Sequence, residues 1–295
     1  MSTESGVQAI DIVCDFEFAD ASVERPDWSK RFITDKVGGD PAIFDDVTPE
    51  AYIEKMDNAG VEHTLIVATR AGSADHRIHR HIPYEKVAAI VERFPSRFSG
   101  LAGVDPTAGM RGLRELEHAV RDLGFVGAHL YPHWFEMAPD HAKYYPIYAK
   151  CAELNIPIQM QVGHCLRYSD DRPLRSVGRP ILLDTLACDF PELKIIGIHI
   201  GWPWTEEMIS VSYKHPNVYI GSDAYAPRYW PQSFVHYIDT WGKNKVLFGT
   251  DFPVIDPERA LREIAELSLR AESRQRLLRD NAVELYGLHD RLSGR

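Results

Sequence analysis

Acidic, imidazole and amide side chains stand at the ends of several apolar runs in this sequence. The residues concerned are Asp15, Glu17, Gln161, His164, His199 and Asp251. Carboxylate oxygens and imidazole nitrogens suit a hard or borderline divalent cation that keeps an open position for water, such as zinc, manganese or magnesium. Imidazole and carboxylate groups can also exchange protons with water or substrate directly. The sequence therefore predicts a polar site that either binds a cation or catalyses proton transfer without one.

Strands that end at one common edge would bring these residues together. The apolar runs, read as strands, cover residues 7–14, 63–68, 98–104, 125–131, 156–160, 193–199, 217–220 and 245–249. The amphipathic stretches that alternate with them, read as helices, cover residues 49–58, 77–94, 109–122, 143–155, 180–189, 204–214, 230–241 and 256–268. Eight strand-helix units in 295 residues predict an α/β protein with a closed (β/α)8 TIM barrel, in a single domain over residues 1–295. An open doubly wound sheet is the alternative, but no Gly-x-Gly-x-x-Gly motif follows any strand.

His199 has the clearest position among the candidate residues. It ends the run Leu193–Ile198, and Gly201 and Pro203 then break the strand. In a parallel barrel, active sites are built at the carboxyl ends of the strands. The alternative is a core histidine that is hydrogen-bonded to a backbone carbonyl.

The composition restricts the class of protein. The formal net charge is -10, and no basic run interrupts the sequence, which argues against a nucleic-acid surface. No apolar run approaches the length of a membrane span, and the first residues lack the apolar core of a signal peptide. The four cysteines are widely spaced without a Cys-x-x-Cys pair. We therefore expect a cytoplasmic protein that binds a small molecule, and neither nucleic acid nor membrane.

Two further segments flank the predicted barrel. Residues 19–46 are rich in Pro, Gly, Asp and aromatic residues without a clear period, and they follow the acids of the first strand. A long loop in a compact domain is usually functional, so we expect an insertion that forms a lid over the barrel mouth or a dimer contact. Residues 270–295 are expected to form C-terminal helices and a tail.

Aromatic and basic residues around the strand ends predict a pocket for a planar, carboxylated small molecule. Aromatic faces stack on planar groups, and arginine binds a carboxylate with two parallel hydrogen bonds. The candidate substrate-binding residues are Tyr131, His133, His164, Arg167, Trp202, Tyr225 and Arg228. The alternative is that these aromatic residues pack the barrel rim or a subunit interface.

Four motifs together resemble the amidohydrolase-related family, in the branch that contains aminocarboxymuconate-semialdehyde decarboxylase and γ-resorcylate decarboxylase. They are the motifs at Tyr144–Tyr148, Asp189–Lys194, Pro216–Tyr219 and Leu247–Pro253, the last of which reads Leu-Phe-Gly-Thr-Asp-Phe-Pro. The resemblance extends over residues 48–286. It implies a (β/α)8 barrel with its active site at the carboxyl face, Asp251 as a metal ligand and His199 as the catalytic histidine. It is also compatible with a homodimer.

The sequence departs from the family pattern at two strand ends. The first strand carries no His-x-His or Glu-x-His; one alignment puts Asp15 and Glu17 at the ligand positions, and another puts Val13 and Asp15 there. The fifth strand has Gln161-Val162-Gly163 in place of His-x-Gly, with His164 next as a possible ligand. A metal site of Asp15, Glu17, Gln161 and Asp251 is rich in oxygen, which favours manganese or magnesium over zinc.

The sequence thus predicts an amidohydrolase-superfamily enzyme that decarboxylates or hydrolyses a small carboxylated or cyclic substrate, with preference for the carboxy-lyase. In this prediction His199 and Asp251 are the catalytic pair. Two alternatives stay open because the usual histidines are missing. One is a metal-independent hydrolase of a lactone or amide that uses His199 and Asp251. The other is a non-catalytic ligand-binding barrel.

Overall fold

The protein is described by a computed structural model that covers residues 8–14, 27–44, 48–72, 80–167 and 173–293. Asp15 and Glu17, the two acids predicted as metal ligands, lie outside these described residues. So do residues 19–26 and 45–46 of the predicted insertion.

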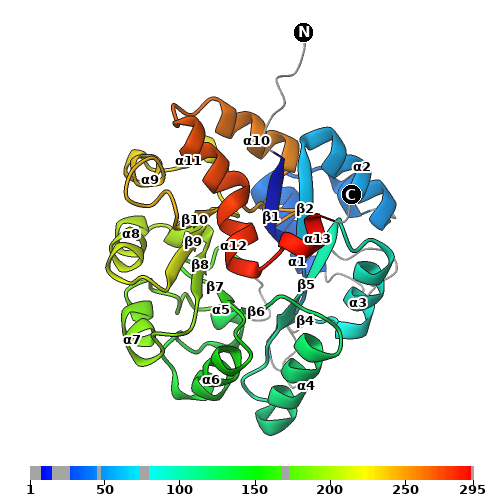
Figure 1. Cartoon of the computed structure of the whole chain (residues 1–295), viewed down its shortest axis with the longest axis vertical. Helices are drawn as coiled ribbons and strands as arrows, with labels where there is room; N and C mark the ends of the chain where they lie inside the picture. Colours follow the sequence, from blue (N-terminus) through cyan, green and yellow to red (C-terminus); the bar gives the residue numbers. More distant parts are fainter. Residues whose placement is uncertain (1–7, 15–26, 45–47, 73–79, 168–172, 294–295) are drawn as a thin grey trace.

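Eight parallel strands follow one another around a barrel (Figure 1). Their bounds are β1 Ala9–Cys14, β2 Val61–Ala68, β5 Phe98–Gly103, β6 Gly127–Leu130, β7 Ile158–Gln161, β8 Ile195–Ile198, β9 Val218–Gly221 and β10 Val246–Leu247. The barrel closes between its first and last strands, where Ile12 N donates a hydrogen bond to Phe248 O at 3.1 Å. A parallel bridge between Cys14 and Phe252 continues this contact. The predicted (β/α)8 barrel is confirmed, and the open-sheet alternative is wrong.

Most strand residues on both faces are apolar because both faces are covered. Ile10, Leu101 and Ile196 pack inside the barrel together with residues of the C-terminal helices. Ala9, Ala128 and other outward residues pack against the surrounding helices in a second cluster. Strands buried on both faces read as continuous apolar runs in the sequence, and this is why all eight could be located there.

Helices surround the barrel and follow the predicted ranges closely. They are α2 Pro49–Ala59, α3 Tyr84–Arg93, α4 Gly109–Arg121, α6 Tyr145–Glu153, α7 Leu182–Asp189, α8 Thr205–Lys214, α9 Gln232–Ile238 and α10 Pro257–Ala265. The prediction for residues 77–94 was too long. Arg80–His81 form a short strand, β4, which pairs antiparallel with β3 (Arg70–Ala71), and the helix starts only after Pro83.

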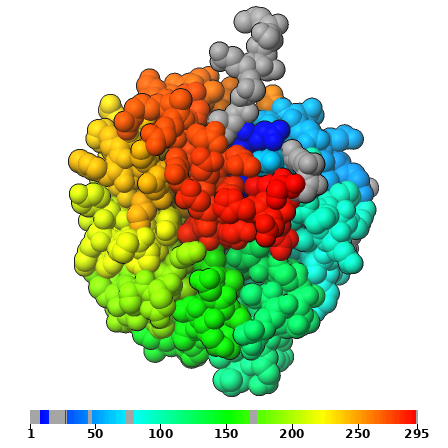
Figure 2. All heavy atoms as spheres, viewed as in Figure 1, coloured from blue at the N-terminus to red at the C-terminus, as the bar shows by residue number. Residues whose placement is uncertain are grey.

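The amino end of the barrel is closed by the C-terminal part of the chain. This part contains α11 Ala271–Gln275, η7 Arg276–Asp280, α12 Asn281–Tyr286 and α13 His289–Leu292. Figure 2 shows these segments, in orange-red and red, across the centre of one face. Leu285, Leu288 and Leu292 are buried in the same apolar cluster as the barrel interior. The last helices therefore belong to the core.

Three short helical segments lie between β1 and α2. They are α1 Asp27–Arg31, η2 Phe32–Val37 and η3 Pro41–Phe44. Another short helix, α5 Pro132–Phe135, follows β6. Lys36 Nζ in η2 donates a hydrogen bond to Leu166 O at 2.8 Å, which connects this segment to the loop after β7. Among the described residues, no helix is both long enough and apolar enough to span a membrane.

Candidate active site

Three neighbouring strands, β8, β9 and β10, bring His199, Asp223 and Asp251 together at their carboxyl ends. His199 Nε2 lies 3.4 Å from Asp223 Oδ2 and 3.7 Å from Asp251 Oδ2. One ligand atom from each of the three side chains lies within 4.8 Å of the other two. The structure therefore forms a compact cluster of one imidazole and two carboxylates at the barrel mouth.

The backbone at this cluster adopts conformations that most residues avoid. His199 has φ 68° and Asp251 has φ 54°, both in the left-handed region. Such conformations cost about 1–3 kcal/mol each in non-glycine residues, and they concentrate at functional sites. His199 N donates a hydrogen bond to Asp223 Oδ1 at 3.2 Å, so Asp223 helps to fix this turn.

Two carboxyl groups at this end of the barrel are fully buried, Asp223 of the cluster and Asp11 on β1. Burial raises the pKa of Asp223 to about 7, although the backbone hydrogen bond from His199 opposes the shift. Burial also raises the pKa of Asp11, on β1, to about 6. Asp11 accepts hydrogen bonds from Thr250 N at 2.9 Å and from the Thr250 hydroxyl, and it adds negative potential at Asp223. A region with this many buried acids favours a proton or a cation beside them.

A cavity of about 440 Å³ opens above the cluster and contains His199 and Asp251 in its wall. Its basic wall residues are Lys36, Arg167 and Arg259. Its aromatic wall residues are Phe32, Trp134, Tyr225 and Tyr229. This volume and this mixture of apolar and charged groups suit a small organic anion.

Most of the site residues predicted from sequence meet in this cavity. Gln161, His164, His133, Arg167 and Tyr225 line it together with His199 and Asp251. The strands that carry them are far apart in sequence, which is the arrangement expected at the carboxyl end of a barrel. Whether these residues perform their predicted roles stays a prediction.

Three of the predicted substrate-binding residues do not line the cavity. Tyr131 is buried, and its hydroxyl lies 3.3 Å from Thr69 Oγ1. Trp202 is 38% exposed and is not part of the cavity wall. Its ring centroid lies 5.5 Å from that of Tyr225. The Arg228 guanidinium forms an ion pair at 2.6 Å with the buried Glu263, because a buried carboxylate requires such a partner.

His133 is held as a neutral hydrogen-bond donor. Burial lowers its pKa to about 4, so its ring is uncharged near neutral pH. Val177 N donates a hydrogen bond to His133 Nδ1 at 3.1 Å, so the ring proton belongs on Nε2. His133 Nε2 is buried and has no hydrogen-bond partner among the described residues. The His133 ring lines the cavity, but its Nε2 atom is itself buried.

Sequence reasoning missed Asp223, Lys36 and Arg259. A signal for Asp223 was present: Gly221-Ser222-Asp223 after β9 repeats the pattern Gly249-Thr250-Asp251 after β10. Lys36 and Arg259 gave no comparable signal, because each reaches the cavity from an element distant from the strand ends.

Comparison with known proteins adds the family. A model described as amidohydrolase matches residues 14–288. The chain belongs to this family. Among curated relatives, the 2-amino-3-carboxymuconate-6-semialdehyde decarboxylase of Dictyostelium discoideum is 24% identical over 69% of this chain and 65% of its own length. The γ-resorcylate decarboxylase of Polaromonas sp. is 24% identical over 79% of this chain and 82% of its own length.

Solved structures with the same fold include proteins of known and unknown activity. An uncharacterized TIM-barrel protein from Bordetella bronchiseptica is 23% identical, with a TM-score of 0.78. The match covers 97% of the present chain and 99% of the Bordetella chain. A dihydroxybenzoic acid decarboxylase from Polaromonas sp., solved with manganese and the inhibitor 2-nitroresorcinol, is 19% identical, with a TM-score of 0.69 over 96% and 98% of the two chains. At these identities the likeness supports the fold.

Proposed function

We propose that this protein catalyses the non-oxidative decarboxylation of a small, planar, carboxylated substrate with the help of a divalent cation. The observation that carries this proposal is the convergence of His199, Asp223 and Asp251 at the base of a cavity whose wall contains three basic residues. The decarboxylase activities of the curated relatives support the choice of reaction.

The donor atoms fit a divalent cation. Ligand atoms that share one ion at about 2.0–2.2 Å lie about 3.0–3.6 Å apart, close to the 3.4 and 3.7 Å separations around His199 Nε2. Asp223 and Asp251 would hold the ion, with His199 beside it and Gln161 in the same cavity wall. This oxygen-rich set favours manganese or magnesium, and manganese is present in the related Polaromonas decarboxylase structure. When bound, the cation would polarise the carboxylate or a neighbouring hydroxyl of the substrate.

The cavity wall supplies the binding groups for such a substrate. Lys36 and Arg167 offer positive charge to carboxylate or phenolate oxygens, and the Trp134 ring offers an apolar face. Arg259 also lies in the wall, where it forms an ion pair with the buried Glu263 at 2.9 Å. These groups fix the plane of the substrate over His199 and Asp251.

Proton transfer completes the reaction. When the bond between the substrate carbon and its carboxylate breaks, carbon dioxide leaves and the electron pair stays on carbon. A proton from His199 Nε2 or from the Asp251 carboxyl forms the new C–H bond, and solvent restores that proton. Both groups line the cavity, and His199 is oriented by its backbone hydrogen bond to Asp223.

The test is an assay of carbon dioxide release from a panel of hydroxylated benzoates, among them 2,6-dihydroxybenzoate, with manganese added. We expect turnover by the wild-type protein and by a control variant, His236→Asn, whose side chain lies outside the cavity. We expect turnover at least about a hundredfold lower in His199→Asn. Equal turnover by His199→Asn and the control would overturn the assignment of the site.

A metal-independent hydrolase is the second candidate. Two observations favour it. Gln161, a weak neutral ligand, stands at the end of β7. His199 contacts the buried Asp223, which is the arrangement of a general base and the acid that orients it. Hydrolysis of lactones or amides that persists in a chelator, without carbon dioxide release from any acid of the panel, would favour this candidate.

We also propose that the protein is cytoplasmic and acts on a small molecule rather than on nucleic acid or membranes, and that it forms a homodimer. The described cysteines are all free thiols, which suits a reducing compartment. Light scattering coupled to size-exclusion chromatography tests the dimer directly; a monomer mass at micromolar concentration would contradict it.

A further inference from the structure

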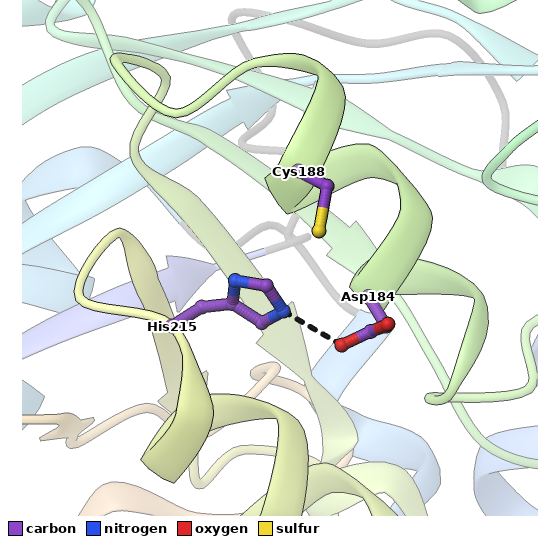
Figure 3. Close-up of side chains that lie close together, drawn as sticks. All are labelled: Asp184, Cys188 and His215. Carbon is purple, nitrogen blue, oxygen red and sulfur yellow. Dashed lines mark hydrogen bonds and ion pairs between the residues drawn. The ribbon is translucent and has the colours of Figure 1, made fainter.

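A second group of metal-ligating side chains lies on the outside of the barrel, away from the cavity. Asp184 and Cys188 belong to α7, and His215 directly follows α8. Figure 3 shows the three side chains pointing toward one another from these two segments. Cys188 stands in the last turn of α7, and His215 stands just before β9 begins at Val218. The group therefore lies toward the amino end of the barrel, opposite the mouth.

The local backbone brings these three donors together. Asp184 and Cys188 are four residues apart, so they lie on one face of the helix, one turn above the other. His215 is fixed by two backbone contacts: its N–H donates to Val211 O at 3.0 Å, and its carbonyl accepts from Lys245 Nζ at 3.0 Å. Its imidazole is only 9% exposed, and its Nε2 lies 2.7 Å from Asp184 Oδ1. One ligand atom from each residue lies within 4.8 Å of the other two.

We propose that Asp184, Cys188 and His215 form a zinc site that is separate from the barrel mouth. Sulfur, nitrogen and oxygen ligands at about 2.0–2.3 Å are the set that zinc accepts, whereas manganese and magnesium prefer oxygen alone. Three protein ligands leave one tetrahedral position for water. The exposed thiol gives the ion an entry path from solvent.

Zinc binding here replaces a weak, exposed ion pair of Asp184 with metal–ligand bonds. Lys214 Nζ lies 2.6 Å from Asp184 Oδ1, but its side chain is exposed, and exposed ion pairs contribute little to stability. Zinc displaces the thiol proton of Cys188 to solvent and binds the Nε2 lone pair of a neutral His215 ring, whose proton is then on Nδ1. The ion then joins α7 to the segment after α8. Because only the folded chain holds these ligands together, zinc stabilises the folded state in proportion to its affinity.

Cobalt substitution tests the site in the full chain. After treatment with a chelator, the protein is titrated with Co²⁺, which gives a near-ultraviolet charge-transfer band only when a thiolate binds it. We expect this band in the wild-type protein and its loss in Cys188→Ser, a change at an exposed position that leaves the fold intact. His215→Ala should weaken cobalt binding at least about tenfold.

Matched controls separate this site from the barrel mouth. Cys165 lines the cavity, so Cys165→Ser and His199→Asn should both keep the band. Lys214→Ala removes the competing cation from Asp184 and should keep or tighten cobalt binding. Zinc should raise the unfolding temperature of wild-type protein by more than that of Cys188→Ser, because, among the described residues, only those at the barrel mouth can bind zinc in the variant. No band in the wild-type protein, or a band that survives Cys188→Ser, would overturn the proposal.

Discussion

The two ends of the barrel use buried polar groups in opposite ways. At the amino end, Asn217 Nδ2 donates to Phe190 O and Leu193 O at 3.0 and 2.9 Å. Tyr286 OH donates to Gln159 Oε1 at 2.6 Å, and Lys245 Nζ donates to the three carbonyls of His215, Pro216 and Val218. At the carboxyl end, buried acids gather instead, and Asp223 and Asp251 face one imidazole.

This difference separates stability from function. At the amino end, Asn217 and Lys245 bond the carbonyls of neighbouring segments, and Tyr286 joins α12 to β7. These hydrogen bonds compensate for burial of the polar groups. The concentration of acids and the left-handed backbone at the carboxyl end reduce stability locally, and they are useful only if a ligand completes them. Substitutions at the mouth should therefore change turnover, and substitutions at the amino end should change the free energy of unfolding.

The largest expected effect is at the mouth. His199→Asn and Asp251→Asn should each lower kcat at least about a hundredfold, because each removes a proton-transfer or ligand group. Asparagine tolerates the left-handed backbone of both positions, so the unfolding temperature should stay near the wild-type value. Steady-state kinetics and thermal unfolding measure the two quantities separately. A variant that loses stability and keeps turnover would contradict the claim that residues at the mouth serve turnover rather than stability.

The next effect is a pH dependence of stability that comes from His63, on β2. Burial lowers the pKa of this histidine from 6.5 to about 4 in the folded chain. Between these values the unfolded chain binds a proton that the folded chain refuses, so the free energy of unfolding falls as pH drops from 6.5 toward 4, by up to about 3 kcal/mol. Urea unfolding at several pH values should show that the free energy of unfolding depends less steeply on pH in His63→Gln than in the wild-type protein. Identical slopes would contradict this account of His63.

Tyr286→Phe should reduce the free energy of unfolding by about 1–3 kcal/mol, because it leaves the buried Gln159 Oε1 without its donor. Tyr286 does not line the cavity, so kcat should be unaltered. Denaturant unfolding and the decarboxylation assay test the two statements. A fall in kcat larger than the loss of folded protein would show that the two ends are coupled.

Gln161→Ala should have the smallest effect, a loss of kcat/KM of less than about tenfold. Gln161 lines the cavity, but a neutral amide adds little charge to the site, and one neutral hydrogen bond contributes about 0.5–1.5 kcal/mol. Kinetics at saturating manganese measure the change. A loss as large as that of Asp251→Asn would show that the amide is an essential ligand.

The fold was predictable because it depends on patterns within single segments. Runs such as Ile195–Ile198 carry no polar side chain because both faces of the strand are covered. The start of α2 depends on an equally local pattern, because Thr48 precedes Pro49 and Ala51 N donates to Thr48 Oγ1 at 3.1 Å. The start of α3 was missed because residues 80–81 form β4 instead, and only the pairing with β3 specifies that strand.

The site was predictable only in part because it depends on contacts between distant segments. His199 and Asp251 follow apolar strands directly, so their place at the mouth followed from the barrel. Arg228 looked like a carboxylate-binding residue, but its partner, Glu263, is 35 residues away on α10. Lys36 reaches the cavity from η2, and no local pattern in the sequence marks such a position.

Manganese binding tests the central claim most directly. We would titrate metal-free wild-type protein and the double variant Asp223→Asn/Asp251→Asn with Mn²⁺ and count the bound ions by electron paramagnetic resonance. Because the Asp184, Cys188 and His215 group disfavours manganese, we expect one bound ion per wild-type chain and none in the double variant. A wild-type chain that binds no manganese, or a double variant that binds it as tightly, would contradict the assignment of a metal-dependent site to the barrel mouth.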